Sequence, residues 1–372
     1  MRRTAPLILG AGPAGCAAAI ALAEAGARPL LLDRDPEPRD QLCGGFLSWR
    51  TAECLRSIGV DPLGLGARRV EQLALFARGR EAVLPLPAPA FGLSRRALDG
   101  ALRQRSLELG ATLEIDTVRA IEGDAVIGRQ HKWMAASLFL ASGKHDVRGA
   151  VRPRDAGDPA LGLRLRLPAS AERGALVANR IELHLFAGGY AGVVLQEDGS
   201  ANVCLAVRKS LLTASSGDPR RMLAGLVDAH PEFARRLADD WPAETVETVG
   251  AVPYGWIARG TRPGLFRLGD QAAVIPSLAG EGIAIALASG TLAARRWLTH
   301  GAAGAIEYQR DFARSAAAPV RTARLARALA ESPLAARLGI GLAARVPPLL
   351  RWLMDASRLG PDAPLAPPRP AP

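Results

Sequence analysis

The sequence predicts an α/β fold in which a doubly wound, Rossmann-like parallel sheet opens the chain and an antiparallel sheet follows. Three stretches predict this fold. Residues 7–33 have the order strand, glycine-rich turn, helix, strand; residues 161–167 and 181–186 alternate apolar and polar side chains; residues 265–287 run from an apolar strand through a glycine turn into a helix. Continuous apolar strands are typical of parallel sheets covered on both faces, and alternating strands of half-buried antiparallel sheets.

The first stretch has the glycine spacing of a dinucleotide-binding turn. Gly10 allows the tight turn out of the strand, and Gly12 lets the backbone approach a pyrophosphate. Gly15 lets the helix expected over residues 13–25 pack closely on the sheet, and the N–H groups and dipole of that helix favour phosphate. Asp33, at the end of the second strand, is placed to accept hydrogen bonds from ribose hydroxyls. A βαβ unit without a ligand is the alternative.

Composition and charge narrow the class of partner. The chain has 372 residues, enough for two domains or one large composite, and a net charge of +11. All but three of its 47 basic residues are arginines, and they are scattered along the whole chain. Aromatic residues make up only 5% of the chain, so few side chains are available to stack on bases. We therefore expect no nucleic-acid partner.

The cysteines and the N-terminus indicate the compartment. The chain has four cysteines, Cys16, Cys43, Cys54 and Cys204. They show neither C-x-x-C spacing nor histidines at metal-ligand spacing, which is typical of a reducing compartment and predicts no metal site. Glycines interrupt the apolar run that follows the N-terminal arginines, so we expect a cytoplasmic N-terminus rather than an export signal. No uncharged apolar run reaches the length of about 18 residues that a spanning helix needs.

Turn and cap residues punctuate the next part of the chain. A polar loop over residues 35–40 leads to Gln41–Phe46, where the pair Gly44-Gly45 permits close backbone approach to a flat ligand. We expect, in order, a helix over about 51–58, a hairpin over 70–86, a helix capped by Ser94, and short strands near 112–128 and 136–142.

The alternating stretch in the middle of the chain is where we expect a sheet that covers a substrate. Residues 161–167 and 181–186 predict half-buried antiparallel strands. A glycine cluster with one tyrosine, Gly188–Gly192, follows them. Such a cluster indicates either a bend at which a ligand approaches or a simple hairpin turn.

The third stretch supplies a second carboxylate and a second helix start. Gly269-Asp270 ends a strand, and a new helix begins near Gly282 and Ile283. A dinucleotide whose far half is a ribityl-isoalloxazine would use both features. Asp270 would hold the ribityl chain, and the N–H groups around Gly282 would face the flavin pyrimidine edge and stabilise the negative charge that develops on reduction.

These residues resemble the FAD-dependent oxidoreductases of the aromatic-hydroxylase (group A flavin monooxygenase) and geranylgeranyl-reductase superfamily. The resemblance is carried, in the expected order, by Gly10 to Asp33, Cys43–Ser48, Ser94-Arg95 with Leu98-Asp99, Ser142–Asp146 with Arg148-Gly149, and Gly269-Asp270 through Gly282. It implies FAD as cofactor. It also implies a three-layer FAD-binding domain with an inserted antiparallel sheet and a helical C-terminus.

The resemblance also implies cofactor contacts and domain limits. The expected cofactor-binding residues are Gly10, Gly12, Pro13, Ala14, Gly15, Asp33, Arg34, Cys43, Gly44, Arg95, Gly269, Asp270, Gly280, Gly282 and Ile283. The expected domains are a discontinuous FAD domain (1–69, 87–152 and 253–300), a substrate-covering sheet domain (70–86 and 153–252), C-terminal helices (301–357) and a disordered tail (358–372). No second dinucleotide motif is present, so we expect NAD(P)H to bind only transiently as the electron donor. The sequence does not distinguish NADH from NADPH.

Two reactions are compatible with this resemblance. A monooxygenase of secondary metabolism would use O₂ and a flavin C4a-hydroperoxide to hydroxylate a hydrophobic aromatic or polyketide-like compound, and this is the expectation we favour. A reductase similar to the geranylgeranyl reductases would deliver hydride to an isoprenoid C=C bond. A non-catalytic flavin-fold binding protein is a further alternative. Halogenation is discounted because the W-x-W-x-I-P motif of the flavin halogenases is absent.

Two residues are candidates for a catalytic role. The thiol of Cys43 is suited to donate a proton, to shape the pocket, or merely to pack as a small apolar group. Tyr190, within the glycine cluster, is suited to position a phenolic substrate or to serve as a structural tyrosine. No set of serine, histidine and aspartate, and no carboxylate pair, is evident, as expected where the cofactor supplies the chemistry.

The C-terminal region is rich in leucine and alanine. Residues 333–354 contain three spaced arginines and a break at Pro347-Pro348. This pattern indicates an amphipathic lid, a membrane-surface helix that admits a hydrophobic small-molecule substrate, or a plain packing helix. Peripheral membrane contact through these helices is therefore one expectation.

Overall fold

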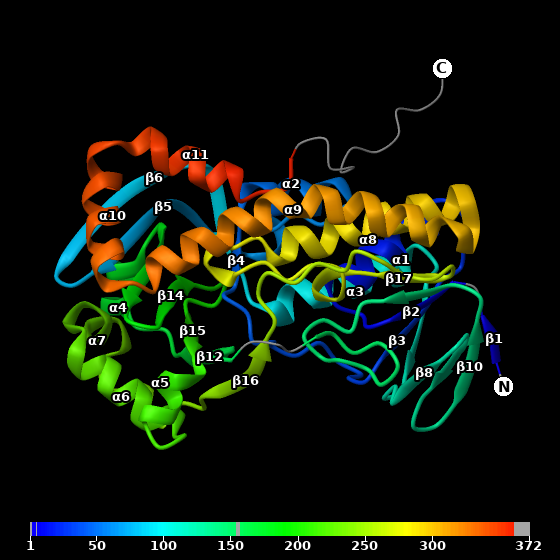
Figure 1. The fold of residues 1–372 in the computed structure, drawn as a ribbon, viewed down its shortest axis with the longest axis horizontal. Helices are drawn as coiled ribbons and strands as arrows, with labels where there is room; N and C mark the ends of the chain where they lie inside the picture. The colour runs from blue at the N-terminus through cyan, green and yellow to red at the C-terminus, as the bar shows by residue number, and fades with distance from the viewer. Residues whose placement is uncertain (1, 5, 154–156, 361–372) are drawn as a thin grey trace.

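The computed structural model describes residues 2–4, 6–153 and 157–360 (Figure 1). A five-stranded sheet lies at the centre of the N-terminal part. Its strands, in spatial order, are β17 (Leu265–Arg267), β11 (Leu138–Leu140), β2 (Leu7–Leu9), β3 (Leu30–Asp33) and β7 (Thr112–Ile115). All neighbouring pairs are parallel. The doubly wound α/β fold predicted from the sequence is confirmed.

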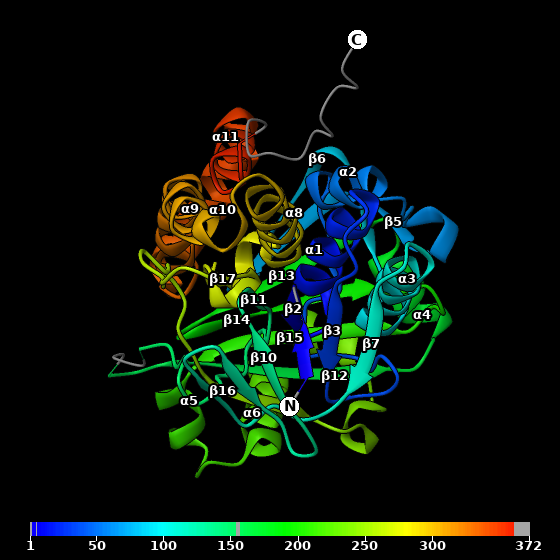
Figure 2. The same ribbon diagram turned by 90° about the vertical axis from the view of Figure 1, so that its right-hand side faces the viewer.

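Both faces of this parallel sheet are buried, which explains why its strands are apolar throughout. Ile8 and Leu31 point toward helices α1 (Pro13–Glu24) and α8 (Gly282–His300). Leu7 and Leu32 point to the other face, where a four-stranded sheet packs against them. That sheet has the order β1 (Arg2–Thr4), β10 (Lys132–Ala135), β9 (Ala125–Ile127) and β8 (Ala120–Glu122). Figure 2 shows the resulting three layers, with α1 and α8 on one side and β10 on the other.

Further helices complete the helical layer. They are α2 (Trp49–Ser57), α3 (Arg95–Glu108) and α9 (Gly304–Ala330), with the short turns η1 (Leu63–Leu65), η3 (Gly269–Gln271), η4 (Ser277–Ala279) and η5 (Gly301–Ala303). Ser94 caps α3 as predicted, since its Oγ accepts a hydrogen bond from Ala97 N at 3.1 Å. Helix α2 begins two residues earlier than expected because Ser48 accepts from Thr51 N and caps it.

An eight-stranded sheet forms the second half of the molecule. Its order is β16 (Glu247–Val252), β12 (Ala160–Leu167), β15 (Ala201–Arg208), β14 (Gly189–Leu195), β13 (Arg180–Phe186), β5 (Arg68–Ala77), β6 (Arg80–Gly92) and β4 (Phe46–Leu47). The predicted hairpin is confirmed as β5 and β6, which are longer than expected. All pairs are antiparallel except β13 with β5.

The two faces of this sheet differ. On β13, Ile181, Leu183 and Leu185 line a cavity, whereas Glu182 and His184 point to the opposite face. That opposite face is covered by α4 (Ala171–Val177), α5 (Lys209–Ala214), α6 (Pro219–Ala229) and α7 (Pro231–Leu237), followed by η2 (Trp241–Ala243). The glycine cluster forms the β13–β14 hairpin: Gly188 adopts a positive φ of 75° at the turn, and Gly192 lines the cavity.

The C-terminal helices lie beside β5 and β6 (Figure 1). The predicted break at the two prolines separates α10 (Pro333–Arg345) from α11 (Pro347–Ala356). The expectation of a disordered tail from residue 358 is wrong at its start, because Arg358 and Leu359 are buried. The remainder of that predicted tail, residues 361–372, lies outside the described residues. Within the described part of the chain, no helix combines the length and apolar content needed to cross a membrane.

Candidate active site

The glycine-rich turn connects β2 to α1 with no room for larger side chains. Gly10 has a φ of 105°, which L side chains rarely adopt. A Cβ on Gly15 would overlap the carbonyl oxygen of Gly10. Glycine at these positions therefore lets the turn lie directly beneath the first turn of α1, with the N-terminus of the helix facing outward.

Asp33 supports this turn from the end of β3. Its Oδ2 accepts a hydrogen bond from Ala11 N at 2.7 Å, and its Oδ1 accepts from Asp35 N at 2.9 Å. Arg103 lies 3.7 Å from Oδ2. The carboxylate thus holds the glycine turn against the following loop, at the strand end where a ribose hydroxyl would reach it.

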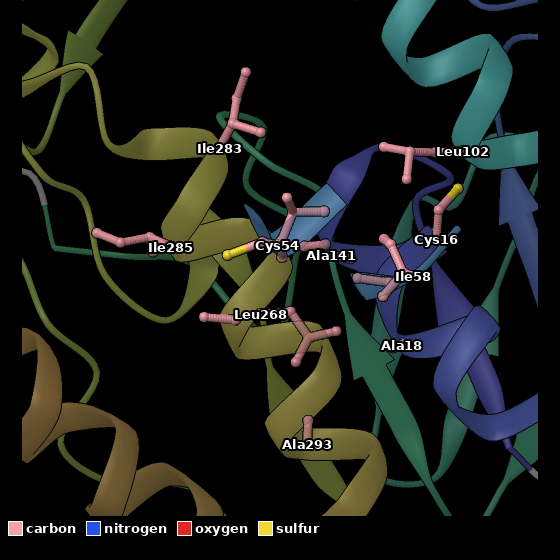
Figure 3. Close-up of a cluster of buried hydrophobic side chains, with 14 of the residues drawn as sticks. Cys16, Ala18, Cys54, Ile58, Leu102, Ala141, Leu268, Ile283, Ile285 and Ala293 are labelled. Atoms are coloured by element: carbon pink, nitrogen blue, oxygen red, sulfur yellow. The ribbon is translucent and has the colours of Figure 1, made fainter. Parts of the chain in front are cut away.

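A second helix N-terminus lies beside the first. Helix α8 packs on α1 so closely that a Cβ on Gly290 would overlap the carbonyl oxygen of Ala14. Figure 3 shows the buried side chains of this region, with Ile283, Ile285 and Ala293 on α8 and Ala18 on α1. Because both helices begin at the same end of the layer, their positive termini face one space.

Two buried polar side chains join the loops around Asp270. Arg152 donates to the carbonyl oxygens of Lys144 (2.7 Å) and Asp270 (2.9 Å) and forms an ion pair with Asp146 at 2.7 Å. Gln271 donates to the carbonyl oxygens of Gly143 and His145 at 2.9 and 3.1 Å. These bonds hold the segment after β11 against the segment after β17.

A cavity of about 530 Å³ extends from the glycine turn to the C-terminal helices. Most of the predicted cofactor-binding residues line it: Gly12, Pro13, Ala14, Cys43, Gly44, Arg95, Gly269, Asp270, Gly280, Gly282 and Ile283. Four do not. Gly10 and Gly15 shape the turn from beneath, and Asp33 supports it. Arg34 is half exposed and lies 3.3 Å from the ring of His145.

Arg95 and Cys43 lie together at the cofactor end of the cavity. The guanidinium of Arg95 makes two hydrogen bonds to Asp99, Nε to Oδ1 at 2.8 Å and Nη2 to Oδ2 at 2.6 Å. The Cys43 side chain lies beside the same guanidinium and, with Asp99, favours its charge. Burial acts to lower the pKa of Arg95, but Asp99 and Cys43 outweigh it and raise that pKa, so the charge persists beside Gly12.

Three hydroxyl groups meet on the wall of the cavity. Ser277 Oγ lies 2.6 Å from Tyr190 Oη and 2.9 Å from Tyr254 Oη. Burial raises the pKa of both tyrosines, that of Tyr254 to about 12, so both are protonated at neutral pH. The three hydroxyl groups carry one proton each, and the two hydrogen bonds within the cluster use two of them. One proton is therefore left to donate to a ligand oxygen.

Most of the remaining cavity lining is apolar, although Arg358 also belongs to it. The apolar lining comes mainly from the eight-stranded sheet and the last two helices, and includes Leu73, Leu75, Leu86, Ile181, Leu183, Leu185, Ala336, Ile340, Ala343, Leu350, Leu353 and Met354. Such a lining binds a hydrocarbon chain and excludes water.

The residues at the cofactor end fit FAD. Cβ atoms at Gly44 and Gly282 would have no neighbour within 4 Å, so the backbone there is open to a ligand. Two helix N-termini face the cavity, as a pyrophosphate and a flavin pyrimidine edge require. Asp270 lines the same cavity, where its carboxylate can accept from ribityl hydroxyls.

Comparison with known proteins agrees with this fit. The family described as "FAD binding domain" matches residues 3–83. The chain belongs to the superfamily of FAD-dependent oxidoreductases. It is therefore an enzyme, as expected, and FAD is its cofactor.

Relatives and solved structures give the extent of the similarity. The chain is 28% identical to digeranylgeranylglycerophospholipid reductase 2 of Methanopyrus kandleri, over 77% of this chain and 75% of the relative. It is 27% identical to menaquinone reductase of Mycolicibacterium smegmatis, over 79% and 76%. The structure of the flavin-dependent brominase Bmp2 matches with a TM-score of 0.74 at 15% identity, covering 95% of this chain and 94% of that one.

A further match is PqsL of Pseudomonas aeruginosa, described as a probable FAD-dependent monooxygenase. It has a TM-score of 0.66 at 16% identity and covers 92% of this chain and 99% of that one. At these identities the structural matches show a shared fold.

Sequence reasoning did not single out several residues that shape the site. Arg152, Gln271, Tyr254 and Ser277 follow no local motif, and they act through contacts with distant segments. Arg358 was placed in the expected disordered tail, yet it lines the cavity. The one signal available was the scarcity of tyrosine: only three occur, and two of them meet at Ser277.

Proposed function

We propose that this enzyme is a reductase that adds hydrogen across a carbon–carbon double bond of a long isoprenoid compound. The observation that carries the proposal is the apolar cavity that continues from the cofactor-binding residues to α10 and α11. Its length and lining suit a flexible hydrocarbon chain. The sequence relatives that cover about three quarters of this chain are reductases, which supports the same conclusion.

The chain's own residues bind, orient and protonate in this proposal. FAD, reduced by NAD(P)H, supplies the hydride. The N–H groups of α1 beside Gly12 hold the pyrophosphate, and Asp270 holds the ribityl chain. The leucines of β5 and β13 hold the hydrocarbon chain and exclude water from the reacting carbons.

The reaction consumes one hydride and one proton for each double bond, so a proton donor is needed. We assign this role to Cys43, whose Sγ lies beside Arg95 at the cofactor end of the cavity. The remaining hydroxyl proton of the Tyr190–Ser277–Tyr254 cluster holds an oxygen atom of the substrate and sets which double bond is presented.

The test is anaerobic turnover of the FAD-loaded enzyme with NADH or NADPH and a prenylated quinone or geranylgeranyl compound dissolved in detergent. A product that has gained two hydrogen atoms in the absence of oxygen is the expected result. Oxidation of the nicotinamide without a hydrogenated product, across both substrate types, would contradict the proposal.

Hydroxylation of an aromatic compound is the second candidate, and the hydroxyl cluster favours it. A phenolic oxygen would accept the free proton of that cluster as readily as a quinone oxygen does. The same assay separates the two reactions, because a monooxygenase requires oxygen and gives a product that has gained an oxygen atom.

A further inference from the structure

The outer face of α10 is apolar and exposed. Leu334, Leu338 and Leu342 are 66%, 65% and 47% exposed. They are four residues apart, so they form one stripe along the helix. The opposite face of α10 is buried on the eight-stranded sheet through Ile340 and Ala343. The exposed leucines are therefore not needed to hold α10 in place.

The helices on either side of α10 extend this stripe. Leu325 and Leu329 at the end of α9 are 62% and 57% exposed, and Trp352 on α11 is 64% exposed. Of the fourteen exposed large apolar side chains in the described part of the chain, seven fall within residues 325–352. Such a concentration marks an interaction surface, since isolated exposed apolar residues are ordinary.

The charges on this surface are mostly positive. Between Phe312 and Ala356 the sequence has seven arginines and two acidic residues, Glu331 and the exposed Asp355 near the end of α11. Glu331 is buried and pairs with Arg208 and Arg327, so it offers no negative charge to a partner. By contrast, the side chains of arginines 337, 345 and 351 are exposed.

The cavity reaches this surface. Leu329 and Leu342 line the cavity and are also about half exposed. On α11, Leu350, Leu353 and Met354 line the cavity while Trp352 points to solvent. A ligand that leaves the apolar surface between these helices therefore meets side chains that already belong to the cavity.

These features together fit a lipid surface. A leucine and tryptophan stripe flanked by arginines is the pattern of a helix that lies in the interface of an anionic bilayer. A second copy of the chain fits less well, because a two-fold interface would bring the same arginines together. We propose that the end of α9 together with α10 and α11 docks on an anionic membrane, from which the cavity takes its hydrophobic substrate.

The test measures binding of the FAD-loaded enzyme to vesicles by flotation. One set of vesicles contains phosphatidylcholine alone, and the other contains an equal share of phosphatidylglycerol. We expect binding to the anionic vesicles, weakened by salt. The triple variant Leu334→Gln, Leu338→Gln, Trp352→Gln should lose at least about tenfold of this binding. Each of Arg337→Gln, Arg345→Gln and Arg351→Gln should lose about fivefold.

Matched controls keep the test specific. Leu298→Gln with Ile306→Gln alters exposed apolar residues elsewhere, and Arg39→Gln with Arg310→Gln alters exposed arginines elsewhere; both pairs should bind as the parent does. The altered residues of the triple variant do not line the cavity, so its FAD content and its turnover of detergent-dissolved substrate should be unchanged. This readout separates failure of docking from failure of the proposed reaction.

Three outcomes would overturn the proposal. The parent could fail to bind either vesicle at low salt. The controls could lose as much binding as the surface variants. Sedimentation could show a dimer that the triple variant abolishes, in which case a second copy covers the surface.

Discussion

Arg358 forms an ion pair with Glu281, Nε to Oε1 at 3.2 Å, and thereby attaches the C-terminal segment to the start of α8. The guanidinium also lies 3.7 Å above the ring of Trp49. The neighbours of Glu281, Gly280 and Gly282, line the cofactor end of the cavity. A single buried pair thus connects the last described residues to the helix that would face the flavin.

Replacing Glu281 by Gln should change how stability depends on pH. Burial raises the pKa of Glu281 from 4.5 to about 7 despite Arg358. The folded protein therefore holds this proton more tightly than the unfolded chain does, and the associated stability is present below pH 4.5 and lost as the pH rises through about 7. We expect the parent to lose about 3 kcal/mol relative to Glu281→Gln across this window.

The measurement is urea unfolding at a series of pH values, with Glu53→Gln as the control because Glu53 is an exposed glutamate on α2. If the free energies of unfolding of the parent and Glu281→Gln changed with pH in the same way, Glu281 would ionise in the folded protein as it does in water, which would contradict the prediction.

Gly15→Ala should abolish FAD binding. The new Cβ would overlap the backbone of Gly10, so the turn and the start of α1 must separate. We expect a loss of at least about 3 kcal/mol in stability and purified protein without the visible absorption of flavin. Gly225→Ala on α6 is the control, because its Cβ meets no neighbour within 4 Å and should stabilise the helix slightly. If Gly15→Ala were purified with its full content of flavin, the assignment of this turn to the cofactor site would be contradicted.

Tyr190→Phe should alter turnover without loss of FAD. The change removes one hydroxyl from the cluster at Ser277, and loss of one hydrogen bond in the reacting complex corresponds to about tenfold in kcat/KM. Tyr308→Phe is the control, because Tyr308 is also buried but donates to Arg267 O outside the cavity lining. Unchanged steady-state kinetics for Tyr190→Phe would restrict Tyr190 to a structural role.

Cys43→Ala should lower kcat at least about tenfold while FAD remains bound. Cys204→Ala is matched to it, because Cys204 also lines the cavity and burial raises the pKa of its thiol to about 12. If Cys43 only packs, the two variants should lose the same small amount of activity. In solvent deuterium oxide, a donor role for Cys43 predicts a solvent isotope effect on the parent that disappears in Cys43→Ala.

Arg236→Met should destabilise the fold by about 3 kcal/mol, because it removes the two-point partner of the buried Glu182 carboxylate and leaves only Arg180 and His184 beside it. Arg236 donates to Glu182 Oε2 at 2.8 Å and to Oε1 at 3.0 Å. Burial acts to raise the pKa of Glu182, but His184 and Arg236 lower it, so this carboxylate is charged at neutral pH. Urea unfolding measures the cost, with the exposed neighbour variant Arg235→Met as control. Equal midpoints for the two variants would contradict the prediction.

Local chemistry let the sequence by itself determine the α/β class, the dinucleotide turn, the caps and the alternating strands. Gly10, Gly12 and Gly15 lie within one turn, and Ser94 lies three residues from the N–H that it caps. Interactions over such short spacings leave a readable pattern, because few other structures satisfy the same residues. Most segments that line the cofactor end of the cavity were likewise identified, since they follow a strand or begin a helix; the loop with Cys43 and Gly44 was identified from its glycine pair.

Only the tertiary structure decided which distant residues meet. Tyr190 and Ser277 are 87 positions apart, and Gln271 is 128 positions from the Gly143 carbonyl that it binds. The strand β10 was not expected, because it is short and gains its order by pairing with β1 and β9. Arg358 lies in a proline-rich end that composition alone assigns to disorder, yet burial against Glu281 and Trp49 orders it. Such contacts depend on how whole layers of the fold pack together, and this packing cannot be predicted from the spacing of residues along the chain.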